Sequence, residues 1–97
     1  MGEVVVVATA RVKEGEEGRM REVLQQLAAA SQQEEGCITY ALHVAKDDPC
    51  RFVIIERWTS QEALDEHLKL PHVRLVADNA DALDGQPQVF FCEAVLA

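Results

Sequence analysis

The sequence predicts one α+β domain over residues 1–97, of the ferredoxin-like type, with the order β-α-β-β-α-β and an antiparallel sheet. Three observations predict this class. A β-branched run opens the chain, a stretch of helical periodicity follows it, and two strand-like runs are then joined by a turn. A second helical stretch and a last apolar run complete the pattern, and 97 residues suit one domain with a modest core.

The first strand is expected over residues 3–12, where Val4 to Ala8 form a run without alternation. Such a run is typical of a strand that is covered on both faces. A helix is expected from Glu16, because acidic residues stand in its first turn and Gly36 supplies a stop. The helix has one largely apolar stripe, formed by Met20, Val23, Leu24, Leu27 and Ser31.

Two strands, 37–45 and 50–58, are expected to form a hairpin through the four-residue turn 46–49, Lys-Asp-Asp-Pro. This turn predicts Ala45 opposite Cys50 and His43 opposite Phe52, and directly opposed residues share a face. One predicted face holds Cys37, Thr39, Ala41, His43, Phe52, Ile54, Glu56 and Trp58. The other holds Ile38, Tyr40, Leu42, Val53, Ile55 and Arg57, and is expected to face the helices.

The second helix is expected to begin at Thr59, which with Glu62 has the spacing of a capping box. It runs to Pro71, and a further helix is expected over 73–83 with one side formed by Val73, Val76, Ala77, Ala80 and Leu83. The last strand is expected over 88–96.

Two helices can cover only one face of such a sheet. Several strand segments nevertheless have apolar residues at both odd and even positions, and so on both faces of the sheet: residues 4–8, 52–55 and 89–91. Burial of a few hundred Å² of apolar surface at about 25 cal/mol/Å² favours association. We therefore expect a homodimer that packs sheet against sheet, giving a dimeric α/β barrel. The alternative is a monomer whose apolar face forms a ligand groove.

The composition excludes some partners. The net charge is −8, from 9 basic and 17 acidic residues, so neither nucleic acid nor an anionic membrane is an expected partner. The sequence has no apolar stretch of about 18 residues and no signal peptide, which predicts a cytoplasmic protein. Its cysteines, Cys37, Cys50 and Cys92, lack a C-x-x-C pair and are expected to be reduced thiols, with their reactivity left open.

The predicted face with His43 has the composition of a ligand pocket, mostly apolar with a few polar groups. Burial would raise the pKa of Glu56, and a histidine such as His43 can exchange protons near neutrality, so either is a candidate base. Trp58 could stack on an aromatic ligand, with Phe52 and Ile54 as apolar walls.

Each of these residues also has a structural alternative. Glu56 could pair with an arginine across an interface, Trp58 could be a core residue, and His43 could be half exposed. His67 and His72 face either a pocket mouth or solvent. No histidine spacing typical of a metal site, no G-x-G-x-x-G, no P-loop and no G-x-S-x-G occurs, so neither metal nor cofactor is expected.

Three blocks of sequence resemble the antibiotic biosynthesis monooxygenase family. They are Glu34-Glu35-Gly36-Cys37 with Tyr40, then residues 52–58 (F-V-I-I-E-R-W), then Ala63-Leu64-x-x-His67-Leu68 with Pro71-His72. They run in the family's order over nearly the whole chain, and the first and third are most similar to quinol monooxygenases. The resemblance implies a dimeric α+β barrel with a pocket between each sheet and its helices or partner.

The family is functionally mixed. It includes quinol monooxygenases, anthrone oxidases that need neither metal nor flavin, haem-degrading enzymes and an isomerase of a phosphorylated signalling sugar. The histidine and tryptophan of the anthrone oxidases correspond to His43 and Trp58. Their asparagine, tyrosine and arginine correspond to Ile54, Leu64 and Ala77, which departs from that mechanism. The asparagine, tryptophan and histidine of the haem degraders fall near Ala8, His67 and Ala77, so haem degradation is not expected.

The resemblance implies a cofactor-independent monooxygenase that acts on a small electron-rich aromatic molecule such as a quinol. In this hypothesis His43 or Glu56 is the base, Trp58 stacks on the ring, and His67 and His72 orient the substrate. One alternative is a non-catalytic or stress-associated barrel that binds a small hydrophobic molecule. Another is a cofactor-free isomerase.

Overall fold

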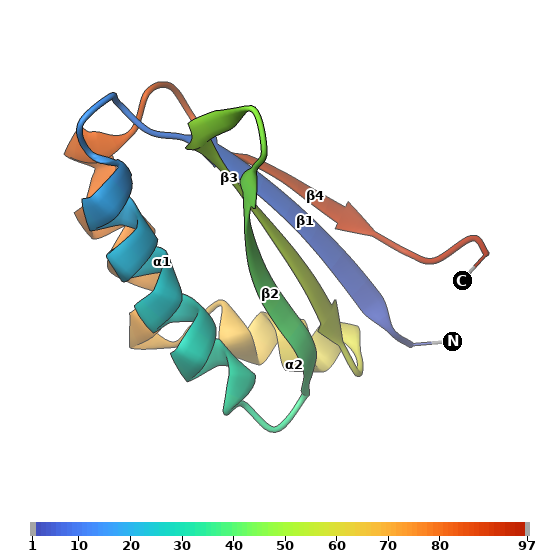
Figure 1. Cartoon of the computed structure of the whole chain (residues 1–97). Helices are drawn as coiled ribbons and strands as arrows, with labels where there is room; N and C mark the ends of the chain where they lie inside the picture. Colours follow the sequence, from blue (N-terminus) through green and yellow to red (C-terminus); the bar gives the residue numbers. More distant parts are fainter. Residues whose placement is uncertain (1, 97) are drawn as a thin grey trace.

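The computed structural model describes residues 2–96, in which a four-stranded antiparallel sheet carries its helices on one face (Figure 1). The strands are β1 Val4–Arg11, β2 Cys37–Ala45, β3 Asp48–Trp58 and β4 Gln88–Cys92. Their order across the sheet is β2-β3-β1-β4, with every neighbouring pair antiparallel. This is the ferredoxin-like arrangement, so the predicted fold class is confirmed.

The first helix, α1, spans Glu17–Gln32 and packs its predicted stripe against the sheet. Its buried residues are Met20, Leu24, Leu27, Ala28 and Ser31. The second helix, α2, spans Gln61–His67. Its N-cap is Ser60 rather than the predicted Thr59, because Ser60 Oγ accepts a hydrogen bond from the backbone N–H of Ala63 at 3.1 Å.

The predicted helix over residues 73–83 is wrong as a continuous element. The segment consists of a 3₁₀ turn η1 (Pro71–Arg74), a short helix α3 (Leu75–Asp78) and a second 3₁₀ turn η2 (Ala80–Ala82). The side-chain amide of Asn79 donates to the carbonyl of Leu75 at 2.8 Å, which satisfies the acceptor that a continuing helix would use. None of the helices between residues 2 and 96 has the length and hydropathy needed to span a bilayer.

The predicted register of the β2–β3 hairpin is also wrong. Ala45 pairs with Asp48, not with Cys50, so only Lys46 and Asp47 form the turn. An irregularity between Val44 and Ala45 then places His43 opposite Val53 instead of Phe52. Because strand side chains alternate between faces, this shift of one residue moves His43 to the opposite face from Glu56.

The face that meets the helices therefore differs from the prediction. It carries Phe52, Ile54, Glu56 and Trp58 of β3 together with Tyr40, Leu42 and Val44 of β2. The opposite face, which we call the outer face, carries no helix (Figure 1). The outer face includes Val5, Val7, Val53, Ile55 and Phe90, with Thr39, Ala41 and His43 from β2. The last strand ends at Cys92 rather than continuing to Leu96.

Candidate active site

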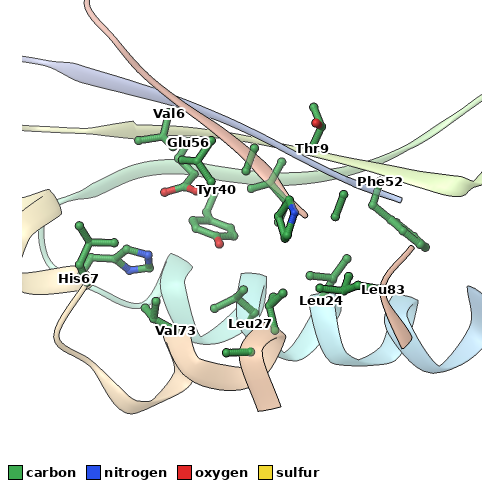
Figure 2. Close-up of a pocket in the computed structure, with 18 of the residues that line it drawn as sticks. Val6, Thr9, Leu24, Leu27, Tyr40, Phe52, Glu56, His67, Val73 and Leu83 are labelled. Carbon is green, nitrogen blue, oxygen red and sulfur yellow. The ribbon is translucent and has the colours of Figure 1, made fainter. Parts of the chain in front are cut away.

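A cavity of about 650 Å³ lies between the helix-facing side of the sheet, α1, α2 and the segment from η1 to η2. Its walls are mainly apolar, and Figure 2 shows Phe52, Leu24 and Leu83 toward one end. Tyr40, Glu56 and His67 gather toward the other end, which we call the polar end (Figure 2). An apolar chamber with polar groups at one end suits a small ring that carries a hydroxyl or carbonyl group.

Glu56 enters the polar end from the middle of the sheet. It stands opposite Val6 of β1 on one side and Tyr40 of β2 on the other, and it is 6 % exposed. The indole Nε1–H of Trp58 donates to Glu56 Oε1 at 2.9 Å. Burial raises the pKa of Glu56, while the bond from Trp58 and the nearby His67 act in the opposite direction. A carboxyl with a raised pKa at the end of an apolar cavity is suited to proton exchange.

His67 enters the polar end from the C-terminal end of α2. Its ring centroid lies 4.4 Å from that of Trp58 and 5.8 Å from that of Tyr40, so the imidazole is held between aromatic side chains. Its Nδ1 donates to Glu34 Oε2 at 2.7 Å, because an ionised carboxylate only accepts. In the neutral ring, Nε2 is then the acceptor.

The Nε2 atom of His67 is free to meet a ligand. Within residues 2–96 it has no hydrogen-bond partner. It is not fully buried either, because the only side-chain oxygen or nitrogen there that is both fully buried and without a partner is Ser31 Oγ. Nε2 therefore retains accessible surface on a residue that lines the cavity. A histidine fixed at Nδ1 by a carboxylate and open at Nε2 is a general base with a defined tautomer.

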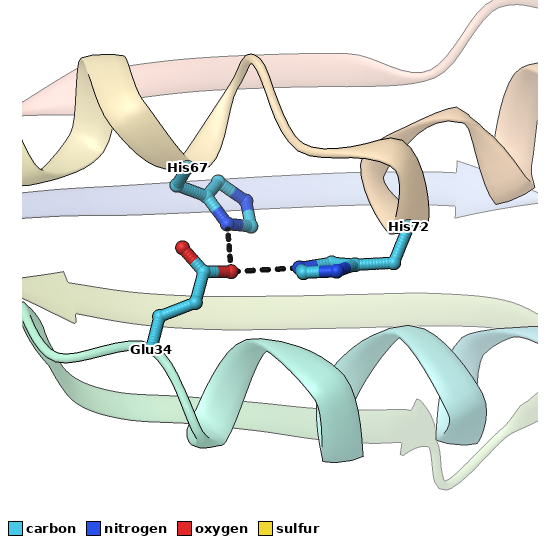
Figure 3. Close-up of side chains that lie close together, drawn as sticks. All are labelled: Glu34, His67 and His72. Atoms are coloured by element: carbon cyan, nitrogen blue, oxygen red, sulfur yellow. Dashed lines mark hydrogen bonds and ion pairs between the residues drawn. The ribbon is translucent and has the colours of Figure 1, made fainter.

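Glu34 also accepts from His72, and we call the three residues Glu34, His67 and His72 the Glu34 cluster (Figure 3). His72 Nε2 lies 2.7 Å from the same oxygen, Oε2, that His67 contacts. The side chains are 13 %, 4 % and 21 % exposed in that order, so Glu34 and His67 are well shielded from water. The other carboxylate oxygen of Glu34 has no recorded partner in the described part of the chain.

The backbone fixes Glu34 beside α2. The Glu34 N–H donates to the carbonyl of Ser31 at 3.1 Å, and the Glu34 carbonyl accepts from Cys37 N–H at 3.1 Å. Thr59 N–H then donates to the Gly36 carbonyl at 2.9 Å, which ties this turn to the entry of α2. A Cβ on Gly36 would lie 2.3 Å from Cβ of Ala63, so glycine allows the close approach.

Two further titratable groups lie near the polar end. Burial, followed by the charge of Glu56, raises the pKa of Tyr40 far above its ordinary value, so the phenol stays neutral. Burial and the charges of Glu34 and Glu56 raise the pKa of the Cys37 thiol. Cys37 is thus kept as a thiol, which is the less nucleophilic form. All three cysteines are free.

The structure places the predicted site residues in three groups. Phe52, Ile54, Glu56 and His67 line the cavity. Trp58 is fully buried behind Glu56 and His67, and His72 reaches the site only through Glu34. His43 lies on the outer face and is exposed, so it does not meet Glu56 within one chain.

Sequence reasoning missed Glu34 and Tyr40 as site residues. The sequence pattern correctly predicts Tyr40 on the helix side, but it predicts the pocket on the other face. Glu34 belongs to the E-E-G-C block that carries the family resemblance, which is the signal that could have identified it. The spacing of the histidines in the sequence does not indicate the Glu34 cluster, because its carboxylate comes from a turn 33 residues before His67.

Comparison with known protein families gives a match over most of the chain. A model of the family described as antibiotic biosynthesis monooxygenase matches residues 3–79. No curated protein is significantly similar to the sequence.

Several solved structures have the same fold. A crystal structure of an antibiotic biosynthesis monooxygenase is 30 % identical, covers 96 % of this chain and 99 % of its own, and has a TM-score of 0.89. Rv0793 from Mycobacterium tuberculosis is 26 % identical, with 98 % and 97 % covered and a TM-score of 0.90. A Deinococcus radiodurans protein that carries the same family name is 25 % identical, with 97 % and 94 % covered and a TM-score of 0.88.

Proposed function

Because this chain belongs to the antibiotic biosynthesis monooxygenase family, we propose that it is a cofactor-independent monooxygenase of a small, electron-rich, quinol-like aromatic. One observation carries the proposal. His67 is hydrogen-bonded at Nδ1 to Glu34 and lines an apolar cavity of about 650 Å³ beside a second protonatable group, Glu56.

The cavity suits an aromatic ring with polar groups on one edge. Its volume lies within the range of about 300–1,000 Å³ that is usual for small-molecule sites. The aromatic and aliphatic walls, among them Phe52, Ile54 and Leu83, would bury the ring. The substrate hydroxyl would then meet His67 and Glu56, the polar groups at the end of the cavity.

In the first step His67 Nε2 accepts the proton of the substrate hydroxyl. The positive imidazolium that forms is stabilised by Glu34, whose Oε2 lies 2.7 Å from Nδ1. Glu56 can hydrogen-bond the second oxygen of a quinol, because burial favours its protonated, donating form. Apolar walls that exclude water leave the resulting anion electron-rich.

In the second step that anion transfers one electron to O₂, and the two radicals combine to a peroxide on the ring carbon. The imidazolium of His67 returns its proton to this peroxide, and loss of water then leaves a hydroxyquinone. The quinol and O₂ thus give hydroxyquinone and water: one oxygen atom enters the ring and the other leaves as water. The substrate supplies all the electrons, so the balance requires no further reductant.

The functional unit in this proposal is a homodimer. On the outer face Ile55 is 39 % exposed and Phe90 is 53 % exposed, with Val5, Val7 and Val53 beside them. A contiguous apolar sheet face of this kind favours association with a second copy.

The test is oxygen uptake with a panel of quinols, followed by mass spectrometry of the product formed under isotopically labelled O₂. We expect uptake above the enzyme-free rate and one labelled oxygen atom per product molecule. His67→Ala should abolish most of the turnover, while His43→Ala, on the outer face, should retain it. Uptake at the enzyme-free rate with every quinol would rule out the oxygenase, and turnover without oxygen consumption would indicate an isomerase.

A second candidate is a non-catalytic module that binds a small hydrophobic molecule. Ile54, Leu64 and Ala77 favour it, because these apolar residues line the cavity at positions that correspond to polar residues of anthrone oxidases. Turnover by the wild type, together with its loss in His67→Ala, separates the two functions. An enzyme should lose turnover much more than ligand affinity, whereas a binding module should keep most of its affinity and have no turnover to lose.

A further inference from the structure

We propose that the Glu34 cluster is a binding site for a divalent transition cation of the Zn²⁺ class. The ligand atoms are Glu34 Oε2, His67 Nδ1 and His72 Nε2, and all three lie within 4.8 Å of one another (Figure 3). They come from the turn after α1, the end of α2 and the 3₁₀ turn η1, so the fold assembles them. The histidine spacing in the sequence gives no sign of the site.

The chemistry of the donor set selects the class of cation. Two imidazole nitrogens and one carboxylate oxygen form the three-ligand set of many zinc sites, with a fourth position left for water or another ligand. Mg²⁺ and Ca²⁺ prefer sites built mainly from oxygen, so two nitrogen ligands disfavour them. The carboxylate of Glu34 supplies a negative charge next to the cation, and His72, at 21 % exposure, leaves a route from solvent.

Cation binding requires the three side chains to rearrange around the ion. With metal–ligand distances of about 2.0–2.2 Å, the ligand atoms around a tetrahedral cation lie roughly 3.3 Å apart. Glu34 Oε2 now lies 2.7 Å from each histidine nitrogen, so each of these oxygen–nitrogen separations would lengthen by roughly half an ångström, and the two nitrogens, within 4.8 Å of each other, would draw together around the cation.

Metal binding changes the role of His67. In the hydrogen-bonded cluster Nδ1 carries the proton and Nε2 is the acceptor. A cation on Nδ1 needs the lone pair of that nitrogen, so the proton of the neutral ring moves to Nε2. Nε2 then becomes a donor and cannot accept a proton from a substrate. Zinc would therefore inhibit the proposed oxygenase, and this consequence, unlike metal binding itself, depends on the proposed function.

The test is isothermal titration calorimetry of ZnCl₂ into the full chain, without a histidine tag, after dialysis against a chelator and with a non-thiol reductant. We expect saturable binding of one Zn²⁺ per chain. His72→Ala and Glu34→Gln should each weaken it at least roughly tenfold. The matched controls are His43→Ala, an exposed histidine on the outer face, and Glu35→Gln, the exposed neighbour of Glu34. Both controls should bind Zn²⁺ as the wild type does.

Thermal unfolding with and without ZnCl₂ gives a second readout. Zn²⁺ should raise the Tm of the wild type and of both control variants, but raise that of the cluster variants less. If His72→Ala does not fold, Glu34→Gln, which preserves the size of the side chain, still provides the comparison. Absence of one-equivalent binding, or equal binding by the cluster variants and their controls, would overturn the proposal. Because neither measurement uses a quinol, a failure here is distinct from a failure of the oxygenase assay.

Discussion

Glu34 Oε2 lies 2.7 Å from His67 Nδ1, although the two residues are 33 positions apart in the sequence. The contact fixes which ring nitrogen of His67 carries the proton and leaves the other available toward the cavity. It also places a carboxylate where it can stabilise an imidazolium. The consequences of this contact can be tested by substituting Glu34.

Glu34→Ala should lower kcat of the proposed oxygenase by roughly a hundredfold, because His67 loses both its fixed tautomer and the charge that stabilises its protonated form. Glu34→Gln, which keeps an accepting oxygen but no charge, should be less damaging. The measurement is the initial rate of oxygen uptake at saturating quinol. The control is Glu35→Gln, whose rate should match the wild type, and equal rates for Glu34→Ala and this control would contradict the role of Glu34.

Glu56→Gln should increase thermal stability, and the gain should grow with pH. Burial raises the native-state pKa of Glu56 above its ordinary value of 4.5. Its contribution to stability is therefore fully present below about pH 4.5 and is lost as the pH rises through the raised native value. Glutamine does not titrate, and its oxygen can still accept from Trp58 Nε1.

Thermal unfolding of Glu56→Gln and wild type between pH 4 and pH 8 tests this sign, in steps of roughly one unit. The difference in Tm should be smallest at the acid end and largest near neutrality. Glu22→Gln, at an exposed position in the middle of α1, is the control and should show no such trend. A difference in Tm that is constant with pH would mean that Glu56 titrates alike in the folded and unfolded states.

Gly36→Ala should destabilise the protein, whereas Gly18→Ala should stabilise it. The added Cβ on Gly36 would lie 2.3 Å from Cβ of Ala63, and overpacking of this kind costs about 1–3 kcal/mol. A Cβ on Gly18, in the first turn of α1, meets no atom within 4 Å, and alanine in a helix gains up to about 1 kcal/mol over glycine. Urea unfolding at constant pH measures both changes, and a Gly36→Ala variant as stable as Gly18→Ala would contradict the role of the close contact with Ala63.

The elements that depend on local pattern could be predicted from the sequence. The apolar stripe of α1 follows helical periodicity, and Met20, Leu24 and Leu27 are buried as that periodicity requires. The strand order then follows from the β-α-β-β-α-β sequence of elements. The family resemblance includes His67 and Glu34, but the proximity of the two residues depends on how the turn after α1 meets α2.

The position of His43 could not be predicted, because strand register has no local signal once a hairpin contains a bulge. With the irregularity between Val44 and Ala45, the observed pairing of His43 differs from the predicted one by one residue, and one residue is enough to exchange the faces. For the same reason the cavity was expected beside His43 although it lies beside Tyr40. The prediction of one helix over 73–83 is wrong for a different reason. The side-chain amide of Asn79 donates to the carbonyl of Leu75 and replaces the backbone hydrogen bond that would continue the helix.

Ile55→Lys should convert the proposed homodimer to a monomer. Ile55 lies on the outer face and is 39 % exposed, with Val7 and Ala41 opposite it on the neighbouring strands. In a symmetric interface each substitution occurs twice, so two uncompensated ammonium groups would enter one apolar contact. The cavity lies on the other side of the sheet, so the variant should keep its fold.

Light scattering coupled to size-exclusion chromatography measures the change. The wild type should have about twice the chain mass of 10.8 kDa at micromolar concentration, and Ile55→Lys about the chain mass itself. Gln25→Lys, exposed on α1, adds the same charge away from the sheet and should remain dimeric. A monomeric wild type would refute pairing through the outer face. A dimeric Ile55→Lys would place the contact between the two copies on another surface.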